Sequence, residues 1–230
     1  MSTTSDYNVA FFGATGGCVL AALVKSLGEG YTCSALVRNP SKLEKLLAEK
    51  GISEQVQQDH LRVVTGSATD ISDVKHTIQS PDGQLTSLVV SGVGGAPKLW
   101  PNPFKPTLDQ PSICQDSMKA VVQAVKQLRS SESGYAPYVV AISTTGVDAN
   151  VDDVPLLLHP LYHWSLPIPH ADKRLMEEGV CKAVKEGTFS HFTIIRPSLL
   201  TNGASYYDVL RAGYSGRAQD DRWNISKAKL

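Results

Sequence analysis

The sequence predicts a doubly wound parallel α/β sheet within a single domain over residues 1–230. Short apolar runs alternate along the chain with segments that have the apolar spacing of amphipathic helices. A glycine-rich turn joins the first apolar run to the first helical pattern. Because strands that alternate with helices at this spacing form parallel sheets with right-handed crossovers, we expect the strand order 3-2-1-4-5-6.

Each expected element follows from its apolar pattern and from the residues at its ends. The strands are expected at 7–12, 32–37, 61–65, 85–91, 138–143 and 191–195, and the helices at 17–27, 41–48, 71–79, 113–128 and 170–185. Gly28 and Gly30 are expected to close the first helix. Ser41 is the expected N-cap of the second helix, with Glu44 three residues on, and Asp70 is the expected N-cap of the third.

Two long loops follow the fourth and fifth strands, at about 92–112 and 144–169. Ligands of doubly wound sheets bind at the carboxyl ends of the strands, where these loops begin. We therefore expect the substrate contacts in these loops, and we treat residues 199–230 as a C-terminal tail of the same domain.

The composition excludes several classes of function. Lys and Arg together number 22, as do Asp and Glu, so no net charge attracts nucleic acid or an anionic membrane. No apolar run is long enough to cross a bilayer, and the polar start of the chain contains no secretory signal. The 4 cysteines form no C-x-x-C pair and are expected to be reduced thiols. We expect a cytoplasmic protein without a nucleic-acid or membrane partner.

One histidine pair has a spacing that can bind zinc on a helix, His159 and His163. Pro160 argues against an uninterrupted helix there, and no H-E-x-x-H carboxylate completes the site. We expect no metal.

The most informative pattern is the turn Gly13-Ala-Thr-Gly16-Gly17, which lies between an apolar strand and an apolar helix. Glycine lets the main chain turn sharply and approach a phosphate closely, and the following helix directs its N–H groups and positive dipole end at the anion. A lone G-x-x-G is weak evidence, but its place between strand and helix predicts a dinucleotide pyrophosphate site. An ordinary strand–helix turn that tolerates glycine is the alternative.

The end of the second strand predicts which dinucleotide binds. Proteins that prefer NAD usually have Asp or Glu here, which accepts from the ribose hydroxyls. This chain has Arg38, with Ser41 and Lys42 close behind. A guanidinium pairs with a 2′-phosphate through two hydrogen bonds, whereas a carboxylate repels it. NADP(H) is therefore the expected cofactor, and a solvated surface arginine is the alternative.

Motifs along most of the chain resemble those of one known family. They are Gly13-Ala-Thr-Gly16-Gly17, Leu36-Val-Arg38-Asn-Pro40, Val63-Val-Thr-Gly66-Ser-Ala-Thr69-Asp70, Val90-Ser91-Gly92, Ile142-Ser143-Thr144-Thr145-Gly146, His170-Ala-Asp-Lys173 and Ile195-Arg196-Pro197-Ser198. In this order they resemble the atypical short-chain dehydrogenase/reductases of the NAD(P)-binding, NmrA-like type, particularly the fungal members. The resemblance implies a Rossmann fold and says little about the substrate.

The resemblance also implies roles for individual residues. It implies cofactor contacts by Gly13, Thr15, Gly16 and Gly17 at the pyrophosphate, Arg38 at the 2′-phosphate, Ser67 and Ala68 at the adenine, Ser91 and Gly92 beside the ribose, Thr144, Pro197 and Ser198 at the nicotinamide, and Lys173 at the nicotinamide ribose. The adenine pair of the family usually includes Asp or Asn, which this chain lacks.

The chain departs from the family pattern at two places that affect the fold. The full glycine fingerprint has a third glycine where Val19 stands, so we expect looser packing of helix on strand or a shifted turn, with Gly17 compensating in part. Residues 223–230 resemble a family segment that is normally followed by a further helix and strand. We therefore expect a shortened C-terminal part; a truncated gene product, a lineage-specific shortening and a coincidental match remain open.

A third departure concerns catalysis. Many reductases of this superfamily use Tyr-x-x-x-Lys, but the residue four before Lys173 is Pro169, which suits the first turn of a helix. Proton delivery is then expected from Ser143, from His170, from water or from the substrate itself. His170 shares a helix face with Lys173 and can donate near neutral pH, whereas a partly exposed histidine without a catalytic role is the alternative. Lys173, Ser143 and His170 are the expected catalytic residues.

Two functions are consistent with these features. The first is an NADPH-dependent reductase that acts on a small carbonyl, flavin-like or quinone-like acceptor, and the resemblance suggests a step of secondary metabolism. A flavin or quinone acceptor needs less of a dedicated acid, which agrees with the missing tyrosine. The second is a non-catalytic NADP(H)-binding redox sensor of the NmrA type that regulates a protein partner, which the missing tyrosine and the short C-terminus also favour.

Overall fold

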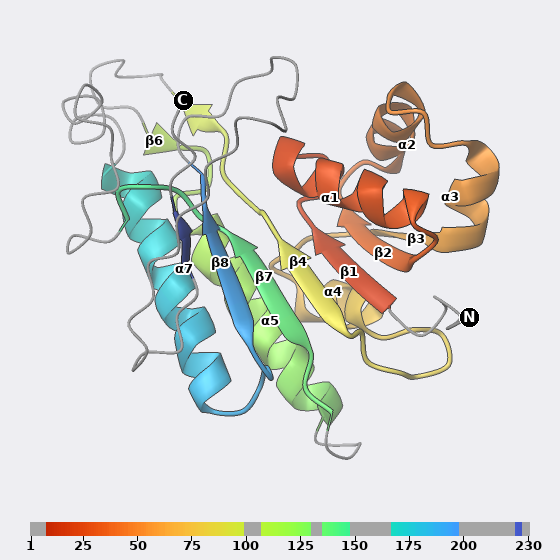
Figure 1. Cartoon of the computed structure of the whole chain (residues 1–230). Helices are drawn as coiled ribbons and strands as arrows, with labels where there is room; N and C mark the ends of the chain where they lie inside the picture. Colours follow the sequence, from red (N-terminus) through yellow and green to blue (C-terminus); the bar gives the residue numbers. More distant parts are fainter. Residues whose placement is uncertain (1–7, 99–106, 130–134, 148–166, 198–223, 227–230) are drawn as a thin grey trace.

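The computed structural model describes residues 8–98, 107–129, 135–147, 167–197 and 224–226. Their main element is a 7-stranded parallel sheet with the order β3-β2-β1-β4-β7-β8-β9, shown in Figure 1. Its strands are β1 Asn8–Phe12, β2 Thr32–Val37, β3 Leu61–Thr65, β4 Leu88–Ser91, β7 Tyr138–Ile142, β8 Phe192–Arg196 and β9 Asn224–Ser226. The short strands β5 Pro97–Lys98 and β6 Thr107–Leu108 form a separate antiparallel pair.

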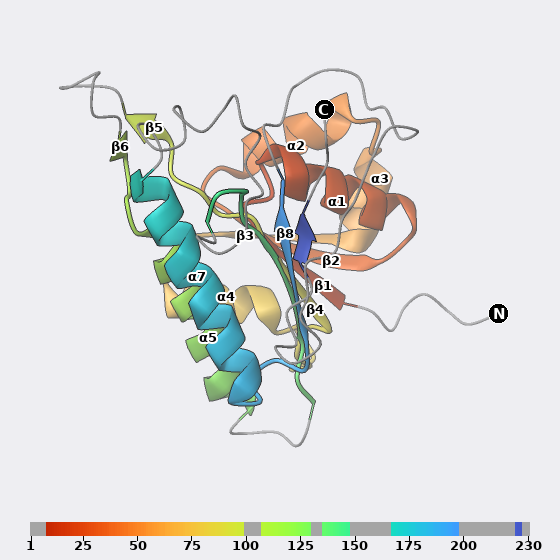
Figure 2. The same ribbon diagram turned by 60° about the vertical axis from the view of Figure 1, so that its left-hand side comes forward.

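Helices cover both faces of the sheet. They are α1 Gly17–Gly28, α2 Pro40–Glu49, α3 Glu54–His60, α4 Ile71–Ile78, α5 Ile113–Arg129 and α7 Pro167–Lys185. Figure 2 shows α4, α5 and α7 side by side on one face, with α1, α2 and α3 on the other. None of the helices in the described ranges is long and apolar enough to cross a membrane.

The strands carry apolar side chains to two cores because both faces are covered. In β4, Val89 packs with residues of α4, α5 and α7, whereas the next residue, Val90, packs with residues of α1 and α2. This alternation explains why the central strands appear as continuous apolar runs in the sequence. The predicted fold class and strand order are confirmed, and β9 adds a strand beside β8.

The helix starts differ in part from expectation. The Asp70 cap is confirmed, since its carboxylate accepts from the backbone N–H groups of Ser72 and Asp73. The predicted Ser41 cap is wrong: the side chain of Asn39 accepts from the Lys42 N–H at 3.2 Å, and Pro40 takes the first helical position, which its fixed φ suits.

Four described elements were not predicted. They are the helix α3 and the strands β5, β6 and β9. The helix α3 spans 7 residues with no buried residue, so the sequence has no apolar stripe there. The expected substrate loops at 92–112 and 144–169 lie partly outside the described residues, as does the tail 199–230 apart from β9.

The glycine turn and the end of β4 approach each other closely. Gly13 has φ +80°, and a Cβ built on it would lie 2.8 Å from the carbonyl oxygen of Gly92. The Gly92 N–H donates to the Phe12 carbonyl at 3.0 Å. Only glycine combines this φ with this approach at low cost, so the turn after β1 requires Gly13.

Val19 occupies the position of the third glycine, and Gly92 provides the space for it. Val19 is buried, and a Cβ built on Gly92 would overlap its Cγ2 atom. A Cβ on Gly17 would have no heavy atom within 4 Å, so Gly17 does not provide the compensation that we expected of it. The small residue that lets α1 pack closely on the sheet is therefore Gly92, directly after β4, and not the residue at position 19 of α1.

We predict that Gly92→Ala destabilises the fold by about 2 kcal/mol, because the new methyl group overlaps a packed side chain. Adding Val19→Ala removes that overlap and restores part of the loss. Urea unfolding of the single and double variants measures both effects.

Gly179→Ala in α7 is the matched control, because its Cβ would have no heavy atom within 4 Å. It should stabilise the protein by about 0.5–1 kcal/mol through the higher helix propensity of alanine. If Gly92→Ala is as stable as the wild type, the packing of Val19 on Gly92 is wrong.

Candidate cofactor and active site

A cleft of about 220 Å³ lies where the carboxyl ends of β1, β2, β3 and β4 meet. The order of the sheet reverses between β1 and β4, and doubly wound folds bind ligands at such a point. The described residues that line the cleft are Gly13, Ala14, Thr15, Gly16, Leu36, Val37, Arg38, Gly66, Ser67, Ala68, Gly92, Val93, Gly94, Gly95, Asp109, Gln110 and Ile113.

The first turn of α1 is suited to an anion. Gly16 is its N-cap and supplies no side-chain hydrogen bond, and the first turn has no acidic residue. The Gly16 N–H closes the turn by donating to the Gly13 carbonyl at 2.9 Å. The N–H groups that begin α1 thus have no side-chain cap, and with the helix dipole they attract negative charge.

The other end of the cleft is formed by the ends of β2 and β3. Arg38 follows β2 directly and is exposed. Ser67 and Ala68 follow β3, and the Ser67 N–H donates to a carboxylate oxygen of Asp73 at 2.8 Å. A Cβ on Gly66 would overlap that carboxylate. Asp73, on the first turn of α4, thus holds the turn after β3.

Lys173 connects α7 to the ends of two central strands. Its ammonium group donates to the Val93 carbonyl at 3.1 Å and to the Ile142 carbonyl at 2.7 Å. Val93 lines the cleft, and Ile142 ends β7. The side chain thus lies between β4 and β7, beside the cleft.

Ser143 follows Ile142 and is 5% exposed. Its N–H donates to the Ile195 carbonyl at 2.7 Å. Its buried hydroxyl oxygen has no hydrogen-bond partner among the described residues. His170 lies in the first turns of α7, three residues before Lys173, and is partly buried. The fold therefore brings Ser143 and Lys173 to the same strand end.

The predicted site residues divide into two groups. Those that line the cleft are Gly13, Thr15, Gly16, Arg38, Ser67, Ala68 and Gly92. Those that do not are Gly17, Ser91, Ser143, Thr144, His170, Lys173 and Pro197. Thr144 and Pro197 are partly buried at the neighbouring ends of β7 and β8, and Ser91 is buried at the end of β4. Ser198, His159 and His163 lie outside the described residues.

Sequence reasoning missed Asp109 in the wall of the cleft. One oxygen of its carboxylate accepts from the Ala96 N–H at 2.7 Å and from the Gln110 N–H at 2.9 Å. A Cβ on Gly95 would lie 3.1 Å from that oxygen. Asp109 therefore holds the glycine-rich loop after β4 against β6. In the sequence, the pair Gly94-Gly95 indicates that another segment approaches the main chain closely here, but it does not indicate that this segment contains Asp109.

Burial favours the protonated form of three thiols, those of Cys114, Cys33 and Cys18. It raises the pKa of Cys114, in the first turn of α5, and of Cys33 to about 12. Burial also raises the pKa of Cys18 in α1, and the positive charge of Lys173 opposes that rise. The positive charge of Lys173 also opposes the rise in the pKa of Cys114. None of the four cysteines, which all lie in the described residues, is in a disulfide.

A buried ion pair joins α7 to the last residue of β8. The Arg196 guanidinium bonds the two carboxylate oxygens of Glu177, with Nε to Oε1 at 3.0 Å and Nη2 to Oε2. Arg196 is 3% exposed and Glu177 is 6% exposed. Arg196 precedes Pro197, so the pair positions the end of β8 at the site.

The parallel sheet, the glycine turn and the cleft at the switch point define a dinucleotide-binding protein of the Rossmann class. The chain belongs to the NAD(P)H-binding family, whose sequence pattern matches residues 13–229. A nicotinamide cofactor is therefore supported, and the resemblance of the motifs to an NAD(P)-binding family is confirmed.

Two curated relatives come from fungi. "Reductase pytE" of Aspergillus terreus is 41% identical over 207 residues, which cover 87% of this chain and 78% of the relative. "Oxidase pynE" of Aspergillus niger is 34% identical over 258 residues, which cover 98% of this chain and 90% of the relative. Both names support an oxidoreductase.

Two solved structures share the fold at low identity. The anaerobilin reductase ChuY of Escherichia coli O157:H7 has a TM-score of 0.64 at 16% identity, covering 97% of this chain and 98% of its own. The yeast methylglyoxal/isovaleraldehyde reductase Gre2, complexed with NADPH, has a TM-score of 0.57 at 16% identity. The match covers 83% of this chain and 57% of Gre2. At this identity both show the fold alone.

We predict that Glu177→Gln destabilises the protein by about 3 kcal/mol, because it leaves a buried guanidinium without its carboxylate. The exposed pair Lys126–Glu186 provides the control. Glu186→Gln should leave the free energy of unfolding nearly unchanged, because water screens that pair. Urea unfolding compares the two variants, and equal effects would contradict the role of the buried pair.

Proposed function

We propose that the protein is an NADPH-dependent reductase that transfers hydride to a small carbonyl, flavin-like or quinone-like acceptor. The proposal rests on one observation: the start of α1, which has no side-chain cap, and the exposed Arg38 line the same cleft. Membership in the NAD(P)H-binding family supports the cofactor class, and the relative named a reductase supports the reaction type.

The residues of the cleft fit a dinucleotide phosphate. Gly13 and Gly16 allow the tight turn that brings the start of α1 to the cleft, because a Cβ on Gly13 would lie 2.8 Å from the Gly92 carbonyl oxygen and one on Gly16 would lie 3.2 Å from the Gly13 carbonyl oxygen. Among the described residues of the cleft, Arg38 is the basic one and Asp109 the acidic one. Because Asp109 already accepts two backbone N–H groups, Arg38 at the end of β2 is suited to a 2′-phosphate.

The bound cofactor would supply the hydride, and the chain would supply orientation and a proton. Lys173 would hold the nicotinamide ribose, with its ammonium group already placed at the ends of β4 and β7. Ser143 would donate its hydroxyl hydrogen to the acceptor oxygen and regain a proton from water, since that buried hydroxyl has no partner among the described residues. His170 is the second candidate donor.

The residue at position 169 bears on the acceptor. Pro169 lies in the first turn of α7 where many related reductases have the acidic tyrosine. A flavin-like or quinone-like acceptor takes hydride without a dedicated acid of that strength, so we favour such acceptors over simple ketones.

Calorimetric titration tests the cofactor assignment. We expect wild-type protein to bind NADPH more tightly than NADH, and Arg38→Ala to weaken NADPH binding by about tenfold or more through loss of a charge-assisted pair. Binding of NADH should not change. Lys50→Ala, which removes an exposed cation at the end of α2 outside the cleft, is the matched control. Absence of binding to both nucleotides would overturn the proposal.

Turnover tests the reductase assignment. NADPH consumption is followed by absorbance with panels of carbonyls, flavins and quinones, and Lys173→Ala should abolish it. Ser143→Ala should slow a carbonyl acceptor by about 100-fold, as expected for loss of a proton donor, and slow a flavin or quinone much less. Tight NADPH binding without turnover of any acceptor would instead favour the regulatory sensor.

A further inference from the structure

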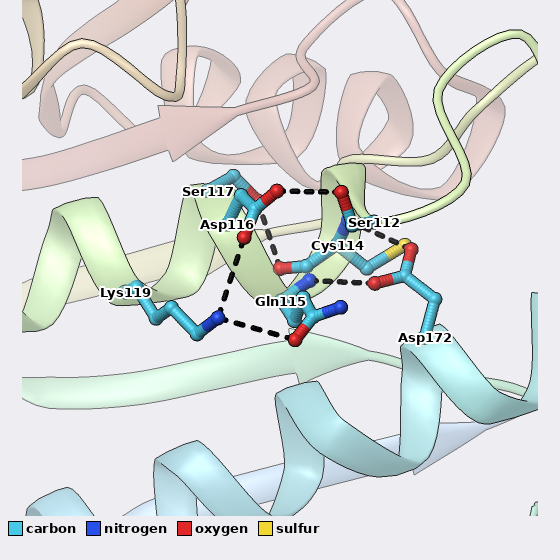
Figure 3. Close-up of polar contacts among 7 residues, drawn as sticks. All are labelled: Ser112, Cys114, Gln115, Asp116, Ser117, Lys119 and Asp172. Atoms are coloured by element: carbon cyan, nitrogen blue, oxygen red, sulfur yellow. Dashed lines mark hydrogen bonds and ion pairs between the residues drawn. The ribbon is translucent and has the colours of Figure 1, made fainter.

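The N-terminus of α5 is capped by a carboxylate from another helix (Figure 3). The Asp172 carboxylate of α7 accepts from the Cys114 N–H at 2.9 Å through one oxygen, and from the Gln115 N–H at 2.9 Å through the other. These N–H groups belong to the first turn of α5 and have no partner within their helix. Asp172 is 2% exposed, so this bidentate contact replaces the water that a carboxylate would otherwise bind.

The residue that would normally form this cap is engaged elsewhere. The Ser112 carbonyl accepts from the Asp116 N–H at 2.9 Å, which places Ser112 at the N-cap of α5. Serine is a preferred N-cap residue, but the Ser112 hydroxyl donates to the Asp116 carboxylate at 2.6 Å. The capping of Cys114 and Gln115 therefore depends on α7.

Adjacent residues of α7 thus make two contacts of opposite charge. Asp172 places an anion on the positive end of α5, and Lys173 places a cation on the carbonyl groups of Val93 and Ile142. Val93 and the first residue of α5, Ile113, both line the cofactor cleft. The start of α7 is therefore fixed to two walls of the site.

We propose that Asp172 is a positioning residue that sets where the Lys173 ammonium group lies beside the cofactor cleft. The inference rests on the proposed function, in which Lys173 holds the nicotinamide ribose. Two of the three N–H donors of the ammonium group are directed to main-chain carbonyls here, and the group also acts on the Cys114 thiol, so the direction of its N–H groups is defined. A shift of α7 would change that direction, and small misplacements at a reacting site are costly.

A double-mutant cycle separates positioning from simple fastening of the two helices. Asp172→Asn keeps the shape of the side chain but turns an amide NH₂ toward a backbone N–H donor. We expect Asp172→Asn to raise the Kd for NADPH about tenfold, in line with loss of a charge-assisted contact. In a Lys173→Met background the same change should alter the Kd less than about twofold, because the group that Asp172 positions is gone.

Ser112→Ala is the matched control, since it removes a hydrogen bond at the same helix N-terminus without touching α7. It should leave the Kd for NADPH unchanged. Equal effects of Asp172→Asn in both backgrounds would overturn the inference and leave Asp172 a structural cap only. If Asp172→Asn does not fold, Asp172→Glu, which keeps the charge but lengthens the arm, enters the same cycle.

A failure of the proposed function is distinguishable from a failure of this inference, because it appears already in the wild-type protein. If wild-type protein binds neither NADPH nor NADH, the cycle is read from urea unfolding of the same variants. Non-additive losses of stability would still support the coupling of Asp172 with Lys173, and additive losses would overturn it.

Discussion

The structure depends on the close approach of two glycines at the centre of the sheet. The turn after β1 and the end of β4 meet main chain to main chain at Gly13 and Gly92, and Val19 of α1 packs into the space that Gly92 leaves. This contact sets the distance between α1 and the sheet. The start of α1, and with it the anion-binding end of the cleft, therefore lies where packing of three small or β-branched residues places it.

Charged groups contact the elements around α7, the helix that carries two of the three expected catalytic residues, Lys173 and His170. Asp172 binds the start of α5, Lys173 binds the ends of β4 and β7, and Glu177 binds Arg196 at the end of β8. Each contact is directional and largely removed from water, so each restricts the helix more than apolar contacts of the same number would. Together these contacts tie α7 to α5 and to the ends of β4, β7 and β8.

Cofactor binding and the choice of acceptor depend on different parts of a Rossmann fold. Cofactor binding uses main-chain geometry that is common to Rossmann folds, so membership in the NAD(P)H-binding family supports a nicotinamide cofactor. The acceptor is selected by side chains on loops, which vary freely on a constant fold. The relatives at 41% and 34% identity are named a reductase and an oxidase, in agreement with this division.

The sequence by itself determined the order of the first six strands of the sheet, the helices that cover the sheet apart from α3, the glycine turn and the family. These follow from periodic patterns and from motifs of neighbouring residues, which are local. The tertiary structure alone decided that Gly92 makes room for Val19, that Asp109 holds the loop after β4 and that Asp172 caps α5. Asp172 and Cys114 are separated by 58 positions, and spacing along a chain does not say which distant side chains meet. Only the packing of α7 beside α5 determines that contact.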